Sequence, residues 1–88
     1  MVKRSIVVQL DQGLEARPAA MFVQIASQFE SSIYVDDDTK RVNAKSIMGM
    51  MTLGLTAGEE LVVTADGIDE ARAIDEIEEY LSNHKKTA

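Results

Sequence analysis

The chain has 88 residues, which suits one small domain over residues 1–88, and a domain of this size favours a shallow surface site over a deep catalytic cleft. Its net charge of −6 disfavours direct binding to nucleic acid, whose phosphates would be repelled. The absence of cysteine excludes disulfides and thiolate metal sites, and we expect a cytoplasmic protein with no metal and no cofactor.

The N-terminal segment predicts a strand. Its apolar run is too short for a signal peptide or a membrane span, so neither is expected. Ile6, Val8 and Leu10 then alternate with Val7 and Gln9, which is typical of a strand with one buried face. The run Asp-Gln-Gly at 11–13 ends this strand.

A helix follows, beginning near Pro18, which suits a first helical turn because its missing N–H costs nothing there. Residues at helical spacing predict one apolar face, which consists of Phe22, Ile25, Ala26 and Phe29. Ser31 and Ser32 are expected to end the helix.

A hairpin is predicted next, because the apolar residues 33–35 and 41–42 flank the polar run 36–40. Ser46 is expected to cap a short helix that extends through Leu53, with Gly54 at its C-terminal end. Packing against the core would anchor so short a helix, so some of its apolar residues must be buried.

The C-terminal third predicts a strand over Leu61–Ala65 and a last helix capped by Asp69. The basic residues 84–86 complement the negative end of that helix. The order β-α-β-β-α-β-α predicts an α+β fold in which helices cover one face of an antiparallel sheet. The last helix carries the apolar face Ala71, Ile74, Ile77 and Leu81.

Two segments carry a family resemblance. Residues 13–20 read Gly-Leu-Glu-Ala-Arg-Pro-Ala-Ala and are similar to the Gly-[Ile/Leu]-His-Ala-Arg-Pro-Ala motif of HPr phosphocarrier proteins, with Glu15 in the histidine position. Residues 42–51 resemble the regulatory serine segment of HPr from Gram-positive bacteria. The resemblance covers essentially the whole chain. It implies a non-enzymatic protein with an open-faced β-sandwich, a four-stranded antiparallel sheet covered on one face by three helices.

In HPr, that histidine takes a phosphoryl group from enzyme I of the phosphotransferase system and passes it to sugar-specific enzymes. An imidazole is nucleophilic near neutral pH, whereas a carboxylate differs in reach and shape. Glu15 therefore predicts a protein that is not competent for sugar phosphotransfer, although a carboxylate can form an acyl phosphate.

The resemblance is closest to the class called Crh, the catabolite-repression HPr of bacilli, which lacks the histidine and carries glutamine there. Glu15 departs from that pattern too. Glu15 either imitates a phosphorylated histidine or is one of many polar residues that suffice once carrier function is lost, and we favour the second. An engineered histidine-to-glutamate change in an ordinary HPr is a further alternative.

The resemblance makes Ser46 the phosphorylation site. It implies that HPr kinase/phosphorylase modifies Ser46 with ATP and that the phosphoprotein is the corepressor of catabolite control protein A, a DNA-binding regulator. Ser46 is also a suitable helix cap, and the two roles are compatible because a helix N-terminus accommodates a phosphate. Lys45 adds a positive charge beside it.

The same resemblance assigns a partner-binding surface beside Ser46. Ile47, Met48 and Met51 form one helical stripe and correspond to an exposed docking patch, while Met50 faces elsewhere and is assigned to the core. Arg17, whose guanidinium is well shaped for a phosphate or a carboxylate, corresponds to a residue that contacts partners. The alternative for Arg17 is a salt bridge to Glu15 or another acid.

Two further functions stay open from the sequence. One is a phosphocarrier of the phosphotransferase system, natural or altered at position 15. The other is a module whose unmodified form regulates a metabolic enzyme.

Overall fold

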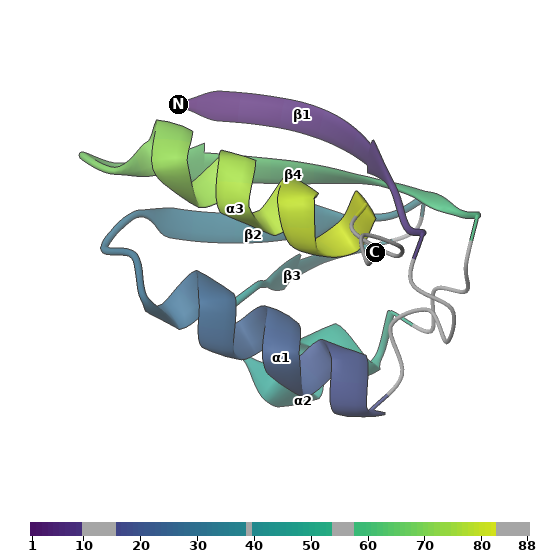
Figure 1. Cartoon of the computed structure of the whole chain (residues 1–88). Coiled ribbons are helices and arrows are strands. Elements are labelled where there is room, and N and C mark those ends of the chain that lie inside the picture. Colours follow the sequence, from purple (N-terminus) through teal and green to yellow (C-terminus); the bar gives the residue numbers. More distant parts are fainter. Residues whose placement is uncertain (10–15, 39, 54–57, 83–88) are drawn as a thin grey trace, which may run out of the picture.

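The computed structural model describes residues 1–9, 16–38, 40–53 and 58–82, and in this part of the chain it forms a four-stranded sheet and three helices. The strand order is β1-β4-β2-β3, and each neighbouring pair is antiparallel. All the helices lie on one side of the sheet, as predicted (Figure 1). The elements in chain order are β1 (Val2–Val7), α1 (Ala16–Ser27), β2 (Ser32–Asp36), β3 (Arg41–Asn43), α2 (Ile47–Met51), β4 (Glu60–Asp66) and α3 (Glu70–Ser82).

The core lies between the sheet and the helices, because alternate strand residues point to that side. Along β4, Leu61, Val63 and Ala65 are buried, and Leu61 pairs with the buried Ile6 of β1. The helices contribute the rest of the apolar layer, including these buried side chains: Ala19, Phe22, Ala26, Met50, Ala73, Ile74, Ile77 and Leu81.

The first strand begins earlier than the sequence predicts. β1 starts at Val2, and Val8 continues its pairing with β4 beyond the end of the strand through a 2.8 Å hydrogen bond to the Glu59 carbonyl. Arg4 occupies a core-side position but remains charged, because its guanidinium lies 2.9 Å from Asp75 and 2.6 Å from Glu78 on α3. An ion pair between strand and helix therefore stands where strand alternation would place an apolar residue, so the apolar pattern that predicts the strand begins only at Ile6. Leu10 lies outside the described residues.

The first helix ends at Ser27, four residues before the predicted stop at Ser31. The backbone continues with hydrogen bonds of the 3₁₀ type, because the N–H groups of Gln28 and Phe29 donate to the carbonyls three residues earlier, at 3.1 and 3.2 Å. Phe29 is still buried, so the predicted apolar face is correct although its last member lies beyond the helix. Ile25 is only half-buried.

The last helix buries Ile74, Ile77 and Leu81, as predicted, but Ala71 is exposed and Ala73 is buried instead. At about 100° per residue, the two alanines lie on opposite flanks of the apolar stripe. Packing against the sheet covers only the flank that carries Ala73. The basic residues 84–86 lie outside the described residues.

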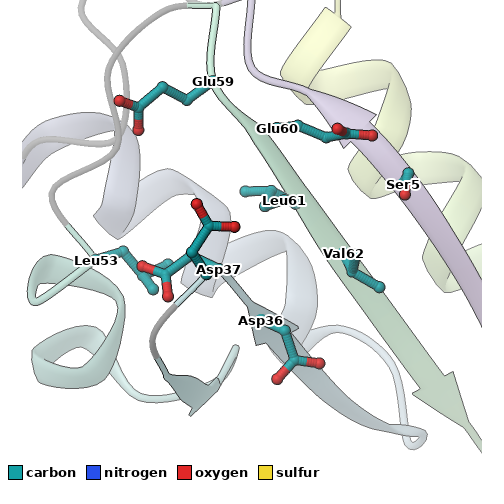
Figure 2. Close-up of a pocket in the computed structure, with 9 residues that line it drawn as sticks. Ser5, Asp36, Asp37, Leu53, Glu59, Glu60, Leu61 and Val62 are labelled. Atoms are coloured by element: carbon teal, nitrogen blue, oxygen red, sulfur yellow. The ribbon is translucent and has the colours of Figure 1, made fainter.

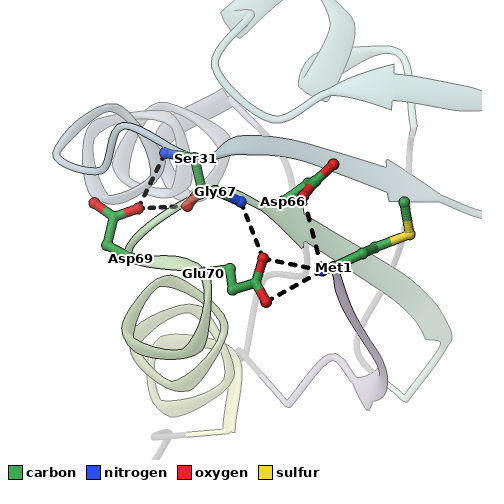
Figure 3. Close-up of polar contacts among 6 residues, drawn as sticks. All are labelled: Met1, Ser31, Asp66, Gly67, Asp69 and Glu70. Carbon is green, nitrogen blue, oxygen red and sulfur yellow. Dashed lines mark hydrogen bonds and ion pairs between the residues drawn. The ribbon is translucent and has the colours of Figure 1, made fainter.

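The residue before α3, Asp69, does not use its carboxylate as the predicted cap. It binds the segment before β2 instead, accepting hydrogen bonds from the Ser31 N–H at 3.0 Å and the Ser31 hydroxyl (Figure 3). It also accepts from the Glu30 N–H at 2.9 Å. These bonds, above all the one from the Ser31 hydroxyl, hold the pKa of Asp69 below its usual value. The contact joins the start of α3 to the loop between α1 and β2.

Glu70 supplies the cap in place of Asp69. Its carboxylate accepts from the Gly67 N–H at 3.0 Å and lies 3.1 Å from the terminal ammonium of Met1 (Figure 3). This reaching back over three residues resembles one half of a capping box. The Gly67 N–H, followed by the ammonium, lowers the pKa of Glu70.

Acidification is expected to destabilise the fold through these two carboxylates. Because the folded-state pKa of Asp69 and of Glu70 lies below the unfolded value, their contribution is present above about pH 4 and is lost as the pH falls through the folded-state values. We expect the melting temperature to fall between pH 6 and pH 3. Asp69→Asn should be less stable at pH 6 and show a shallower decline, and a decline as steep as that of the wild type would contradict this account.

Gly67 leaves no room for a side chain. A Cβ there would lie 2.6 Å from both Cα and Oγ of Ser31, so backbone would have to move. We expect Gly67→Ala to cost about 1–3 kcal/mol of stability. The matched control is Gly49→Ala in α2, where the nearest atoms would be at 3.4 Å and alanine is the better helix former. Urea unfolding of both variants tests this; an equal loss at the two positions would disprove the steric explanation.

Candidate functional site

Ser46 is the N-cap of α2, as predicted. Its backbone is extended, with φ −108° and ψ 114°, and its hydroxyl oxygen accepts from the Gly49 N–H at 3.2 Å. Its carbonyl accepts from the Met50 N–H at 2.9 Å. The hydroxyl oxygen serves the cap as an acceptor, which leaves its O–H hydrogen uncommitted by that bond.

The turn before Ser46 holds it in place. Asn43, the last residue of β3, accepts the Lys45 N–H on its side-chain oxygen at 2.8 Å and the Ser46 N–H on its carbonyl at 3.0 Å. Between them, the buried Ala44 donates its N–H to the Ile33 carbonyl at 2.9 Å. The side chain of Ser46 is therefore positioned by a turn that is fastened to the sheet.

The other end of α2 is also fastened. The Thr52 hydroxyl donates to the Gly49 carbonyl at 2.6 Å, and the Lys40 ammonium donates to the Thr52 carbonyl at 3.0 Å. A cation at a helix C-terminus satisfies carbonyls that lack an intrahelical partner. The helix covers five residues and ends two residues before the predicted Leu53, while Gly54 lies outside the described residues.

The side chains of α2 divide into one core residue and an exposed group. Met50 is fully buried, whereas Met48 is 76% exposed, Met51 50% and Ile47 38%. This is the division that helical spacing and the family resemblance together predict. The surface next to Ser46 thus displays three apolar side chains, which we call the apolar patch: Ile47, Met48 and Met51.

Lys45, which is predicted to add a positive charge beside Ser46 and to bind partners, has a contact within the fold that was not predicted. Its ammonium donates a 2.7 Å hydrogen bond to the carbonyl of Phe29, just beyond the end of α1. The side chain is therefore engaged in joining the Ser46 turn to α1. This contact joins residues 16 positions apart in sequence, which no local pattern reveals.

Glu15 and the side chain of Arg17 lie outside the described part of the chain. The backbone of Arg17 belongs to the first turn of α1, and α1 packs against α2. Among the described residues, no cluster of histidine and acidic side chains is arranged to hold a metal ion. In the same ranges, no helix has the length and apolar character needed to cross a membrane.

An acidic depression of about 500 Å³ lies between the hairpin and the start of β4, and Ser46 is not among its lining residues (Figure 2). Asp36, Asp37 and Asp38 belong to the polar run of the predicted hairpin, and no local pattern indicates that they meet the start of β4. The lining would repel a phosphorylated ligand because its charged groups are all carboxylates. It consists of Ser5, Asp36, Asp37, Asp38, Leu53, Glu59, Glu60, Leu61 and Val62.

A family model described as the PTS HPr component phosphorylation site matches residues 2–83. The chain belongs to the HPr family. The match spans both segments that suggested the family in the sequence, and it identifies the serine-capped helix as part of an HPr scaffold. HPr-family proteins are phosphocarriers or regulators, and this chain is one of them.

Individual HPr-family proteins resemble the chain over nearly its whole length. It is 46% identical over 81 residues to the HPr-like protein Crh of Bacillus subtilis, covering 92% of this chain and 95% of that protein. It is 47% identical over 75 residues to the HPr-like protein Crh of Halalkalibacterium halodurans, covering 85% and 89%. The predicted similarity to Crh is thus confirmed.

The fold is also that of HPr. The crystal structure of a phosphocarrier protein HPr from Bacillus anthracis superposes with a TM-score of 0.88 at 42% identity, covering 91% of this chain and 95% of that one. The open-faced sandwich expected from the resemblance is therefore confirmed.

Met21 is an exposed apolar residue that was not predicted from the sequence. It lies on α1 and is 44% exposed. In sequence it lies between the core residues Ala19 and Phe22, so a search for apolar residues does not separate it from them. On the helix it points away from the face that those two residues share. A large apolar side chain off the buried stripe is the signal that would have marked it.

Proposed function

We propose that this HPr-family protein is a regulator of carbon catabolite repression that is switched by phosphorylation of Ser46. HPr kinase/phosphorylase transfers the γ-phosphoryl group of ATP to the Ser46 hydroxyl in the cytoplasm, and the phosphoprotein then acts as corepressor of catabolite control protein A. The observation that carries the proposal is the position of Ser46 as a helix cap directly beside the exposed apolar patch of Ile47, Met48 and Met51.

The geometry of Ser46 supports a phosphate that leaves the fold intact. Its hydroxyl already projects toward the N-terminal N–H groups of α2, so phosphate oxygens can accept from the same donors. A helix of five residues has a small dipole, and its contribution is correspondingly small. The main effect of the phosphate is a charge of about −1.5 to −2 placed beside apolar side chains, which an arginine-bearing partner can read.

We further propose that sugar phosphotransfer is absent, because Glu15 occupies the position of the phosphate-carrying histidine. A partner built to transfer phosphate to a ring nitrogen meets a carboxylate of different shape and lower nucleophilicity. The second candidate function is the phosphocarrier itself, which membership of the HPr family favours. Labelling by phosphoenolpyruvate and enzyme I separates the two.

The deciding experiment incubates the protein with HPr kinase/phosphorylase and ATP and locates the phosphate by mass spectrometry. We expect one phosphate, on Ser46, and none in Ser46→Ala. Thr52→Ala is the matched control, because it removes the hydroxyl at the opposite end of the same helix and should leave labelling unchanged. An unlabelled wild type, or labelling of Ser46→Ala at the wild-type level, would refute the proposal.

Binding to catabolite control protein A tests the second step. The phosphorylated form should bind at least about tenfold more tightly than the unmodified form, since charge-assisted hydrogen bonds to a phosphate contribute that much or more. Equal affinities of the two forms would show that the phosphate is not the signal.

A further inference from the structure

The short helix α2 carries three methionines in sharply different surroundings. Met48 and Met51 are exposed, while Met50, between them in sequence, has no exposed surface. A thioether is oxidised when its sulfur meets a dissolved oxidant, so exposure decides which methionine reacts. The helix therefore presents two reactive sulfurs to solvent and protects the third.

The reaction is chemically complete with a peroxide as the oxidant. A lone pair of the thioether sulfur attacks one oxygen of hydrogen peroxide, the O–O bond breaks, an S–O bond forms, and the other oxygen leaves as water after proton transfer. The sulfur loses two electrons and the peroxide gains them. Methionine sulfoxide reductases reverse the change, so the modification is a switch and not only damage.

We propose that Met48 and Met51 form a reversible oxidation site, the methionine pair, and that their conversion to sulfoxides by peroxide prevents docking of HPr kinase/phosphorylase on the apolar patch. This inference rests on the proposed function and takes the apolar patch beside Ser46 as the surface on which the kinase docks. The reason is desolvation: a sulfoxide carries a strong hydrogen-bond acceptor, and burying it against an apolar partner surface leaves that acceptor unpaired.

This switch does not require unfolding, because the one methionine whose oxidation would disrupt the fold, Met50, lies in the core. Oxidation of Met50 would place a polar group among fully buried side chains and disrupt the packing of α2. Because Met50 is shielded from solvent, oxidation of the methionine pair changes the surface and leaves the fold intact. The melting temperature of the oxidised protein should therefore stay within about 4 °C of that of the reduced protein.

Two other exposed methionines provide comparisons within the molecule. Met1 lies beside Glu70 and Asp66 at the start of β1, at the opposite end of the structure from α2 (Figures 1 and 3). Met21 lies on α1. Both are expected to oxidise, since both are exposed, but the loss of docking should follow oxidation of Met48 and Met51.

The experiment titrates the folded protein with hydrogen peroxide and measures sulfoxide at each methionine by peptide mass spectrometry. Met48 and Met51 should oxidise at least about tenfold faster than Met50. The same samples, freed of peroxide, are then given to HPr kinase/phosphorylase with ATP. The specificity constant for phosphorylation should fall at least about fivefold on oxidation and recover after treatment with methionine sulfoxide reductases.

Variants assign the effect to the pair. Met48→Leu with Met51→Leu keeps apolar side chains without sulfur, so this double variant should be phosphorylated before and after peroxide at the same rate. Met21→Leu is the matched control and should stay sensitive. Equal oxidation of Met50 and Met48, a double variant that stays sensitive, or undiminished phosphorylation of the oxidised wild type would each overturn the inference. An unlabelled reduced wild type would instead refute the proposed function, and with it the docking step.

Discussion

Replacement of Met50 with alanine is expected to lower the free energy of unfolding by about 2–5 kcal/mol, a large part of the stability of so small a domain. Met50 is fully buried and anchors the five-residue α2 to the core. The loss combines the apolar surface returned to water with the cavity left behind. Met48→Ala, two residues away on the same helix, should change the free energy of unfolding by less than about 0.5 kcal/mol.

Urea unfolding followed by circular dichroism measures both changes. The effects of the two variants on kinase docking should have the opposite order. Met48→Ala should weaken phosphorylation by HPr kinase/phosphorylase although its free energy of unfolding is nearly that of the wild type. A Met48→Ala variant as destabilised as Met50→Ala would show that the exposed side chain contributes to the core, and the assignment of the apolar patch to partner binding would then fail.

The sequence predicted the local arrangement of α2 because the information there is periodic. Helical spacing separates Met50 from Ile47, Met48 and Met51, the family resemblance makes these three the exposed side, and the exposures agree. Ser46 as the cap follows from a hydroxyl residue placed directly before the helix. The strand alternation and the order of elements likewise gave the antiparallel sheet with its helices on one side.

Two of the contacts that fasten this helix could not be predicted, because they join residues that are 12 and 16 positions apart in sequence. Lys45 donates to the carbonyl of Phe29, and Lys40 to that of Thr52. Asp69 has the right residue type and position for a cap, yet Ser31 and Glu30 compete successfully for its carboxylate. Local rules identify the residue that can form a bond, whereas tertiary packing selects the partner.

The same limit applies to the flank of a helix. Spacing places Ala71 and Ala73 symmetrically about the apolar stripe of α3, so periodicity does not distinguish them. The sheet covers only one flank, and Ala73 is the one that is buried.

The acidic depression is another feature that local patterns do not predict. Its carboxylates come from the hairpin and from the start of β4 and meet only in the folded chain.

Glu15→His is expected to convert the protein into an acceptor for enzyme I and phosphoenolpyruvate. The surrounding segment keeps the family pattern, with Arg17 and Pro18 in place, so the substitution restores the nucleophile that the HPr scaffold is built to present. A neutral imidazole nitrogen attacks phosphorus readily at pH 7. The rate of labelling should rise at least about a hundredfold over the wild type.

Two further proteins show whether the histidine itself carries the phosphate. Glu15→Gln removes the carboxylate without adding a nucleophile and should stay unlabelled, as should the wild type. Mass spectrometry of the labelled Glu15→His variant should place the phosphate on the introduced side chain, while phosphorylation of Ser46 by the kinase continues. A wild type that accepts phosphate at Glu15 would contradict the loss of carrier function. A Glu15→His variant that accepts none would show that the partner surface, and not only the nucleophile, has diverged from that of the phosphocarriers.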